Sequence, residues 1–411
     1  MKYVIVQGDG MADRPLKELS GRTPLEVANA PNMDQVASAG EHGLVNTIPE
    51  GLPPGSSVGN MSLMGLDPEK YFTGRAPLEA RGRGLDVGKD DVVFRCNLVK
   101  LGNNGKEKVM EDYSGGHPSS AEAENYIGLL NKKIGKNGFD FHKGVSYRNL
   151  LIWKGGRKEI DLKNISLTPP HDITGEPVGG YLPEGSDSER LSELQEKAGN
   201  LLDEEETSGF NGIWLWGEGV KPELPTFKER YGLSGAVISA VDLIKGLGSY
   251  TGLTPVKVDG ATGSIDTDYE AKVDAALDYL EDESIVFLHV EAPDEASHAG
   301  DIEQKIEAIE RIDSRVVAPL LDHLAGRKDS KFLLVTDHIT GLDSRTHERG
   351  AVPFAVTEFS GPEVTPWRGF TEEEASNTET VFQTGMDLID IFLRREVRNG
   401  SEEYSLYRTG K

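Results

Sequence analysis

Short runs of apolar residues alternate with helical periods at both ends of the chain. Three of these runs predict buried β-strands, at Tyr3–Val6, Ile285–Val290 and Phe332–Val335. Between the second and the third, apolar residues recur at helical spacing over Ile302–Leu324 with charged residues between them, which predicts an amphipathic helix. A closing amphipathic helix is expected over Thr378–Leu393. Strands that alternate with helices are typical of an α/β fold.

The middle of the chain has a different pattern. Strand-like segments are expected at Val92–Leu101 and Leu150–Trp153, with turn residues between them and a loop rich in Pro, His and Gly over 169–180. This pattern is typical of an inserted antiparallel α+β domain. The expected division is an insertion at 91–187 in a core made of 1–90 and 188–411.

After the insertion, the chain is expected to return to the core. The charged stretch over 186–206 predicts the helix that makes this return. Two further buried strands are then expected, at Ile213–Trp216 and Ala236–Ser239.

Composition and charge exclude several classes of protein. The 69 acidic residues outnumber the 44 basic ones, and the net charge of −25 opposes sequence-independent binding to nucleic acid or an anionic membrane. A single cysteine, Cys96, excludes an intrachain disulfide framework and a cysteine-based zinc knuckle. No apolar stretch approaches the ~20 residues that cross a bilayer, and the N-terminus runs into a strand without signal-peptide features. We therefore expect a soluble, cytoplasmic protein.

Three of the predicted strands are each followed by an aspartate. These residues are Asp9, Asp294 and Asp337. Because ligands collect at the carboxyl ends of strands in open α/β sheets, we expect the three carboxylates to converge on one crevice. Histidines accompany two of them: His298 stands one helical turn after Asp294, His338 follows Asp337 directly, and His347 is expected in a nearby loop.

Carboxylates and imidazoles together are ligands for Zn²⁺ or Mn²⁺. Three converging aspartates without a metal would repel one another and destabilise the fold. Six such residues exceed the needs of one tetrahedral site, which points to two metals that clamp a transferring group. Taken singly, each aspartate is better explained as a turn residue or a helix N-cap than as a metal ligand, so the joint pattern carries the prediction.

A second candidate for chemistry lies in the segment 53–60. Gly55 to Gly59 fits the G-x-S-x-G pattern, which would make Ser57 an acyl-transfer nucleophile, but the prolines before it exclude the required interior strand. Alternatively, the segment is a loop that enters a helix near Ser57, where a serine hydroxyl and free backbone N–H groups suit a phosphate. A serine there is also explained as a simple N-cap. Neither a P-loop nor a G-x-G-x-x-G that opens the first helix is present, so nucleotide binding of these kinds is unsupported.

Several segments resemble the archaeal-type, cofactor-independent phosphoglycerate mutases. The resemblance extends over residues 2–393 and implies membership of the alkaline phosphatase superfamily, whose fold is a doubly wound, mostly parallel sheet with an inserted cap. The segments that carry it are Val6–Pro15, Pro54–Pro68, Thr73–Ala80, Phe94–Leu98, Val145–Arg148, Pro169–Asp172, Asp294–His298 and Asp337–His338.

The resemblance implies a site with two divalent metal ions, Mn²⁺ or Zn²⁺, with Co²⁺ and Mg²⁺ as further options, and without 2,3-bisphosphoglycerate. One ion is expected to be held by Asp294, His298 and His347. The other is expected to be held by Asp9, Ser56, Asp337 and His338. The family nucleophile matches Ser56 and not Ser57.

The resemblance also implies the activity. Ser56 is expected to accept the phosphoryl group of 3-phosphoglycerate as a phosphoserine and to return it to the 2-hydroxyl of a glycerate that the cap holds away from water. Arg75 and Arg148 are the main candidates for binding the substrate phosphate or carboxylate, because a guanidinium matches them bidentately, although ordinary ion pairs would explain them nearly as well. The other candidates are His171 and, more weakly, Arg14, Arg95 and Asp172.

The sequence departs from the family pattern at three places, and these departures concern the substrate. Ser57 stands where the family commonly has Asp, the segment Ile339–Gly341 follows the Asp-His pair, and Glu348–Ala351 follows His347. Alternative activities are therefore a homoserine kinase-like phosphotransfer and a metal-dependent phosphatase. A catalytically inactive, metal-stabilised binding protein is a further alternative. The oligomeric state is left open.

Overall fold

The computed structural model describes residues 1–136, 138–185, 188–204, 209–327, 329–359 and 368–393. The chain forms two compact units, the first made of Met1–Phe72 and Glu223–Lys411 and the second of Thr73–Pro222. The second unit thus begins before the expected residue 91 and ends after the expected residue 187.

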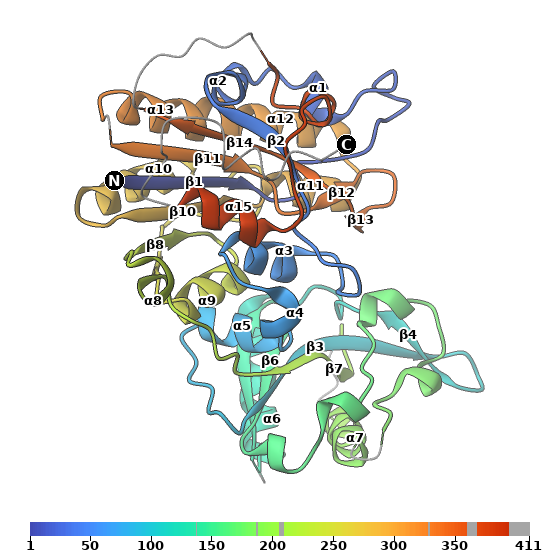
Figure 1. Ribbon diagram of the computed structural model, residues 1–411. Helices are drawn as coiled ribbons and strands as arrows, with labels where there is room; N and C mark the ends of the chain where they lie inside the picture. Colours follow the sequence, from blue (N-terminus) through green and yellow to red (C-terminus); the bar gives the residue numbers. More distant parts are fainter. Residues whose placement is uncertain (137, 186–187, 205–208, 328, 360–367, 394–411) are drawn as a thin grey trace. The chain divides into compact units, whose positions relative to one another are not determined.

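The first unit is built on an eight-stranded, mostly parallel sheet (Figure 1). Its centre is β1 (Lys2–Gly8), which pairs in parallel with β10 (Ile285–Val290) on one side and β11 (Ser330–Val335) on the other. Only β14 (Val352–Glu358) runs antiparallel to its neighbours in this sheet of the described chain. The remaining strands are β2 (Glu41–Val45), β8 (Gly235–Ile238), β9 (Thr254–Val256) and β15 (Val381–Phe382). The three strands expected at the ends of the chain are therefore confirmed.

Helices cover both faces of this sheet. Side chains alternate between the faces along β1, so Val4 and Val6 share one face and Tyr3 the other. The first face carries the buried cluster with α2 (Pro31–Ala39), α10 (Tyr269–Asp282), α12 (Ile302–Ile312) and α13 (Ala318–Leu324). On the second face, Phe392 of α15 (Gly385–Phe392) contacts the Tyr3 ring edge-on at 5.6 Å between centroids. The sheet is therefore doubly wound, as predicted.

Two helices of the structure differ from the prediction, one in its regularity and the other in where it begins. The helix over Ile302–Leu324 contains a π-helical turn at Asp313–Val317, where the Asp313 carboxylate accepts a hydrogen bond of 2.7 Å from the Met33 backbone N–H of α2. The closing helix begins at Gly385 and not at Thr378, because Val381 and Phe382 pair with β2 and Thr384 caps the helix.

The second unit is an antiparallel sheet with helices. Its central strand is β3 (Val92–Asn103), which lies between β6 (Arg148–Trp153) and β7 (Gly212–Val220). The other strands are β4 (Lys108–Asp112) and β5 (Phe139–Val145), and the longer helices are α5 (Ala76–Gly82), α6 (Ser120–Lys133) and α7 (Glu189–Glu204). The predicted α+β character of this region is therefore confirmed.

The return of the chain to the first unit occurs later than expected. The helix expected over 186–206 is α7, which packs on the buried face of the second sheet; residues 186–187 and 205–206 of that range lie outside the described residues. The segment Ile213–Trp216 belongs to β7, which pairs with β3 from Val99↔Gly212 to Val92↔Val220. Both elements were expected in the core, and that expectation was wrong because β7 completes the sheet that β3 begins.

The shorter elements connect these layers. They are α1 (Pro24–Val27), α4 (Pro68–Tyr71), α8 (Phe227–Tyr231), α9 (Asp242–Tyr250), α14 (Glu372–Ser376), and the 3₁₀ turns Gly156–Lys158, Leu162–Asn164, Pro170–Ile173 and Val178–Tyr181.

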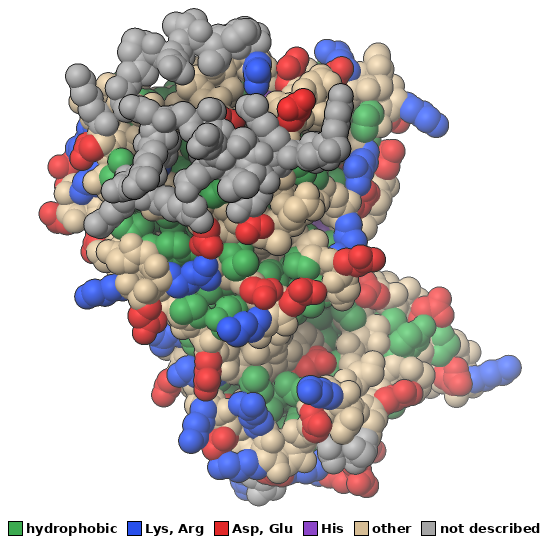
Figure 2. Space-filling model, viewed as in Figure 1, with side chains coloured by type: hydrophobic (Ala, Val, Ile, Leu, Met, Phe, Trp, Pro, Cys, Tyr) green, Lys and Arg blue, Asp and Glu red, His purple; other side chains and the backbone are tan. Residues whose placement is uncertain are grey.

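None of the helices in the described part of the chain is long and apolar enough to span a bilayer. In the view of Figure 2, acidic and basic side chains are interspersed over the visible surface.

Candidate active site

The parallel strands at the centre of the first sheet bring the three aspartates together. Asp9 follows β1 directly, and Asp337 comes shortly after β11. Asp294 lies in α11 (Ala292–Ala299), which begins just after β10. Since β1 is in parallel register with both neighbours, the three chain segments leave the sheet at the same edge.

One group of possible ligands consists of Asp294, His298 and His347, whose ligand atoms lie within 4.8 Å of one another. His298 follows Asp294 by one turn of α11, and its Nε2 lies 3.3 Å from Asp294 Oδ2. His347 Nε2 lies 3.1 Å from His298 Nε2. His347 was expected in a loop, but it lies in a hairpin formed by β12 (Ile339–Gly341) and β13 (Thr346–Glu348). In this hairpin, His347 is paired with Thr340.

A second group surrounds Asp9. His338 Nε2 lies 3.2 Å from Asp9 Oδ1 and 3.3 Å from Asp337 Oδ2. The Asp337 carboxylate accepts hydrogen bonds from Asn60 Nδ2 at 2.8 Å and from the Gly10 N–H at 3.2 Å. Asp9, Asp294 and His338 also form a group with ligand atoms within 4.8 Å, so the two clusters share residues and form one polar centre.

Ser56 is the first residue of α3 (Ser56–Leu63) and faces this centre. Its Oγ lies 3.2 Å from His338 Nε2 and 3.5 Å from Asp9 Oδ2. The preceding Gly55 has a φ of +144°, and a Cβ there would lie 3.2 Å from His347 Nδ1, so glycine permits the close approach of the loop. Ser57 is buried and makes no side-chain hydrogen bond with the described residues. No strand leads into this segment, which confirms the exclusion of a nucleophile elbow at Ser57, and the helix begins one residue earlier than expected.

Burial and neighbouring groups shift the pKa values of Asp9 and Asp337 in opposite directions. Burial and the Asp294 carboxylate raise the pKa of Asp9, but hydrogen bonds with His289 and His338 outweigh them and bring this pKa to about 2. Burial and the Asp9 carboxylate raise the pKa of Asp337 to about 7. Without a metal ion, the centre therefore relieves the repulsion between its carboxylates by holding protons.

The histidines hold further protons. The hydrogen bond with Asp294 raises the pKa of His298 to about 9. Burial lowers the pKa of His338, but the charges of Asp337 and Asp9 outweigh burial and raise it to about 9. Protonated imidazoles balance the negative charge of the carboxylates in the absence of a metal ion. A bound divalent cation would supply this positive charge instead, so metal binding would displace the protons.

The orientation of the imidazoles fits metal binding. His298 Nδ1 lies 2.9 Å from the Arg345 carbonyl oxygen, and His338 Nδ1 lies 3.0 Å from Thr340 Oγ1, so both Nε2 atoms are directed into the centre. Asp9 Oδ1 is buried in this centre, 3.2 Å from His338 Nε2. Carboxylate and imidazole donors with such outer-shell partners are characteristic of Zn²⁺ and Mn²⁺ sites.

A buried polar chain behind Asp9 was missed by the sequence reasoning. His289 Nε2 lies 3.2 Å from Asp9 Oδ2, and His289 Nδ1 lies 3.1 Å from Glu291 Oε1. Glu291 also accepts hydrogen bonds from Ser239 Oγ at 2.7 Å and from Lys272 Nζ at 2.9 Å. The sequence signal that could have indicated this chain is a histidine, His289, inside an otherwise apolar strand, with Glu291 two residues later. This chain of fully buried groups fixes the position of the Asp9 carboxylate.

We expect Glu291→Gln to weaken the binding of Mn²⁺ by about tenfold, because loss of the carboxylate charge frees His289 and so loosens Asp9. Competition with a colorimetric chelator measures this affinity. Glu303→Gln, on the exposed side of α12, is the matched control. Equal affinities in two folded variants would show that the buried chain does not position Asp9.

The predicted substrate-binding residues lie mostly in the second unit. Arg75 and Arg95 both pair with the buried Glu79, at 2.9 Å and 3.1 Å. Burial lowers the pKa of Arg95 to about 10, the Glu79 charge acts in the opposite direction, and Arg75 and Arg148 add to the lowering. The arginines around Glu79 thus form a region of net positive charge, which suits an anion.

The remaining candidates have other partners. The Arg148 guanidinium lies 5.2 Å from the Tyr147 ring centroid. The His171 ring packs on Trp216 at 5.2 Å, while the exposed Asp172 lies 3.6 Å from His171. In the first unit, Arg14 donates a hydrogen bond of 2.8 Å to the carbonyl of Arg349. The structure thus brings together all seven proposed metal-site residues, whereas the proposed substrate residues are divided between the units.

Comparisons with known proteins give a consistent result. The sequence model of a family described as 2,3-bisphosphoglycerate-independent phosphoglycerate mutase matches residues 37–208. A probable 2,3-bisphosphoglycerate-independent phosphoglycerate mutase from Geobacter sulfurreducens is 44% identical over 404 residues, which cover 96% of this chain and 100% of the relative. A protein with that name from Methanothrix thermoacetophila is 46% identical over 403 residues, with the same coverage.

Two solved structures are similar over nearly the whole chain. The PH0037 protein from Pyrococcus horikoshii matches with a TM-score of 0.79 and 27% identity, covering 97% of this chain and 99% of that one. A cofactor-independent phosphoglycerate mutase from Thermoplasma acidophilum matches with a TM-score of 0.63 and 24% identity, covering 96% and 99%. At that identity the second comparison shows a common fold.

Proposed function

Because this chain belongs to the 2,3-bisphosphoglycerate-independent phosphoglycerate mutases, which are isomerases, we propose that its polar centre holds two divalent metal ions and that Ser56 accepts the phosphoryl group. The observation that carries the proposal is the position of Ser56 Oγ, 3.2 Å from His338 Nε2 within the group of candidate ligands. Asp294, His298 and His347 would hold one ion; Asp9, Asp337, His338 and Ser56 would hold the other. Mn²⁺ and Zn²⁺ suit these donors best, with Co²⁺ and Mg²⁺ as alternatives.

Bound divalent ions would supply Lewis-acid stabilisation of the phosphoryl oxygens and favour ionisation of a coordinated hydroxyl. The chain itself places Ser56 at the N-terminus of α3, where backbone N–H groups without helical partners face the incoming phosphate. Asn60 holds Asp337 through a hydrogen bond of 2.8 Å, so the ligand and the nucleophile are positioned by the same helix.

The reaction is a transfer in two steps. Ser56 Oγ forms a bond to the phosphorus of 3-phosphoglycerate while the bond from phosphorus to the 3-oxygen breaks, which leaves a phosphoserine and glycerate. The 2-hydroxyl of the same glycerate then attacks the phosphoserine and gives 2-phosphoglycerate, with Ser56 restored. The arginines around Glu79 in the second unit are the groups that would hold the glycerate carboxylate, and exclusion of water prevents hydrolysis of the phosphoserine.

The test of the proposed function is a product analysis with purified protein and Mn²⁺. With 3-phosphoglycerate, we expect 2-phosphoglycerate to form, as followed by coupling to enolase, without free phosphate and without a need for 2,3-bisphosphoglycerate. Free phosphate as the main product would instead identify a phosphatase. Formation of O-phosphohomoserine from homoserine and a phosphoryl donor, without mutase turnover, would identify the alternative phosphotransfer. A central metabolite as substrate also supports the cytoplasm as the location.

We expect Arg148→Gln to raise the KM for 3-phosphoglycerate by about tenfold with a smaller change in kcat, because a lost charged hydrogen bond to a bound anion weakens binding. Initial rates over a range of substrate concentrations separate the two constants. Arg157→Gln, an exposed residue of the same unit, is the control. An unchanged KM in the Arg148 variant would remove this residue from the substrate site.

A further inference from the structure

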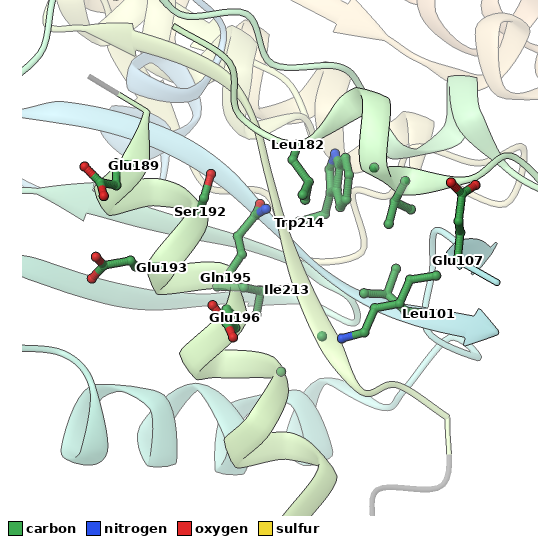
Figure 3. A pocket seen from close by; sticks show the side chains of 15 residues that line it. Leu101, Glu107, Leu182, Glu189, Ser192, Glu193, Gln195, Glu196, Ile213 and Trp214 are labelled. Carbon is green, nitrogen blue, oxygen red and sulfur yellow. The ribbon is translucent and has the colours of Figure 1, made fainter. Parts of the chain in front are cut away.

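The second unit contains a cavity of about 570 Å³ beside β7, and none of the arginines around Glu79 is among its lining residues (Figure 3). Residues of β3, β7, α7 and the 3₁₀ turn Val178–Tyr181 line it. A volume of this size suits a small organic molecule. The proposed mutase reaction does not use this cavity.

The walls of the cavity are mainly apolar. Leu101, Ile213 and Trp214 come from the sheet, and Leu182 follows the 3₁₀ turn. The indole Nε1 of Trp214 already donates a hydrogen bond of 2.8 Å to the Thr168 carbonyl, so this ring offers the cavity an apolar surface. Leu182 is 39% exposed and adds accessible apolar surface to the lining of the cavity.

A side-chain amide in this wall offers the cavity a hydrogen-bond donor. Gln195 of α7 is only 8% exposed, and its side chain extends from α7 toward β7 (Figure 3). Its Oε1 accepts a hydrogen bond of 2.8 Å from the Leu215 N–H, which fixes the amide, while its Nε2 has no partner among the described residues. This amide N–H can donate a hydrogen bond to a molecule in the cavity, so it suits a ligand with a hydrogen-bond acceptor.

The charge around the cavity is negative. Glu189, Glu193 and Glu196 come from successive turns of α7, and Glu107 adds a fourth carboxylate, against one cation at Lys108. Glu193 is paired with the exposed Lys197 at 2.8 Å, which still leaves an excess of carboxylates. Such a surface disfavours anions, phosphoglycerate among them, and attracts a cation.

We propose that this cavity binds a small organic amine, which combines a protonated amino group, an apolar aryl or alkyl body and a hydrogen-bond acceptor. The carboxylates of α7 face the amino group, Trp214 and its apolar neighbours cover the body, and Gln195 Nε2 donates to the acceptor. The residues that line the cavity and those of the proposed phosphotransfer centre are different, so the binding does not depend on that proposal.

Tyramine is the probe, since it has all three features. We expect the full-length protein to bind tyramine in saturation-transfer NMR and calorimetry, also in the presence of 3-phosphoglycerate. Tyrosol, which carries a hydroxyl group in place of the amine, is expected to bind roughly tenfold more weakly, and 4-hydroxyphenylacetate not to bind. Equal binding of the three compounds, or no binding of tyramine, would overturn the proposal.

Two pairs of variants locate the binding. Gly199→Leu fills the cavity, because the nearest atom to a Cβ there is the Asn211 carbonyl oxygen at 3.5 Å, and it is expected to abolish binding. Gly128→Leu on α6, where a Cβ meets nothing within 4 Å, is the matched control and keeps binding. Glu196→Lys is expected to weaken binding roughly threefold, and Asp274→Lys on α10 to leave it unchanged. Tyramine binding that survives in the Gly199 variant would place the amine elsewhere and overturn the assignment.

Discussion

Replacing Ser56 by alanine is expected to lower kcat of the mutase reaction by at least about 10³-fold. The substitution removes the only hydroxyl of α3 for which a contact with His338 and Asp9 is seen, at 3.2 Å and 3.5 Å. The enolase-coupled assay measures the rate. Mass spectrometry of the wild-type protein after rapid acid quenching should show one added phosphoryl group, and the variant should show none.

Ser57→Ala is the matched control for this experiment. Ser57 neighbours Ser56 in the same helix, is buried, and makes no hydrogen bond to the candidate ligands. We expect its activity to stay within about threefold of the wild type, since a buried hydroxyl without a partner contributes little. Full activity in the Ser56 variant, or loss of activity in the Ser57 variant alone, would assign the nucleophile to another residue.

Removal of metal is expected to have the second largest effect. Dialysis against a chelator should lower the activity by about 100-fold or more and lower the melting temperature, because Asp9, Asp294 and Asp337 then face one another without divalent cations. Activity and thermal unfolding are followed before and after addition of Mn²⁺, which should restore both. Metal analysis of the active protein gives the number of ions.

The control for metal removal is dialysis against the same chelator saturated with Mn²⁺. This treatment exposes the protein to the chelator without depleting its metal. A protein that is free of metal by analysis and keeps its full rate would contradict the proposed centre. So would a rate that falls equally in both dialyses.

The central part of the site could be predicted because it follows from local rules. A buried parallel strand ends where the apolar run gives way to polar residues. The apolar runs of β1 and β11 therefore predict that Asp9 and Asp337 lie at the carboxyl ends of these strands. Helical periodicity placed His298 one turn after Asp294. These signals need no knowledge of distant contacts.

The features that could not be predicted depend on pairing over long distances. Whether Ile213–Trp216 belongs to the first or the second sheet depends on its pairing with β3, which no local pattern encodes. The hairpin that carries His347 and the short strand β15 before the last helix have the same origin. His289 was missed because an apolar strand hides a polar residue whose side-chain neighbours, Asp9 and Ser239, come from segments far away in the sequence.

The pairing of β7 with β3 has a consequence for the architecture of the chain. Thr73 Oγ1 donates a hydrogen bond of 2.7 Å to the Val220 carbonyl, so the entry and the exit of the second unit are neighbours. Because its two ends lie close together, the inserted unit could be removed, exchanged or replaced by a short linker while the rest of the chain keeps its topology. Diversification of acceptor preference within such enzymes could therefore proceed by substitution of the inserted unit, leaving the ionic centre intact.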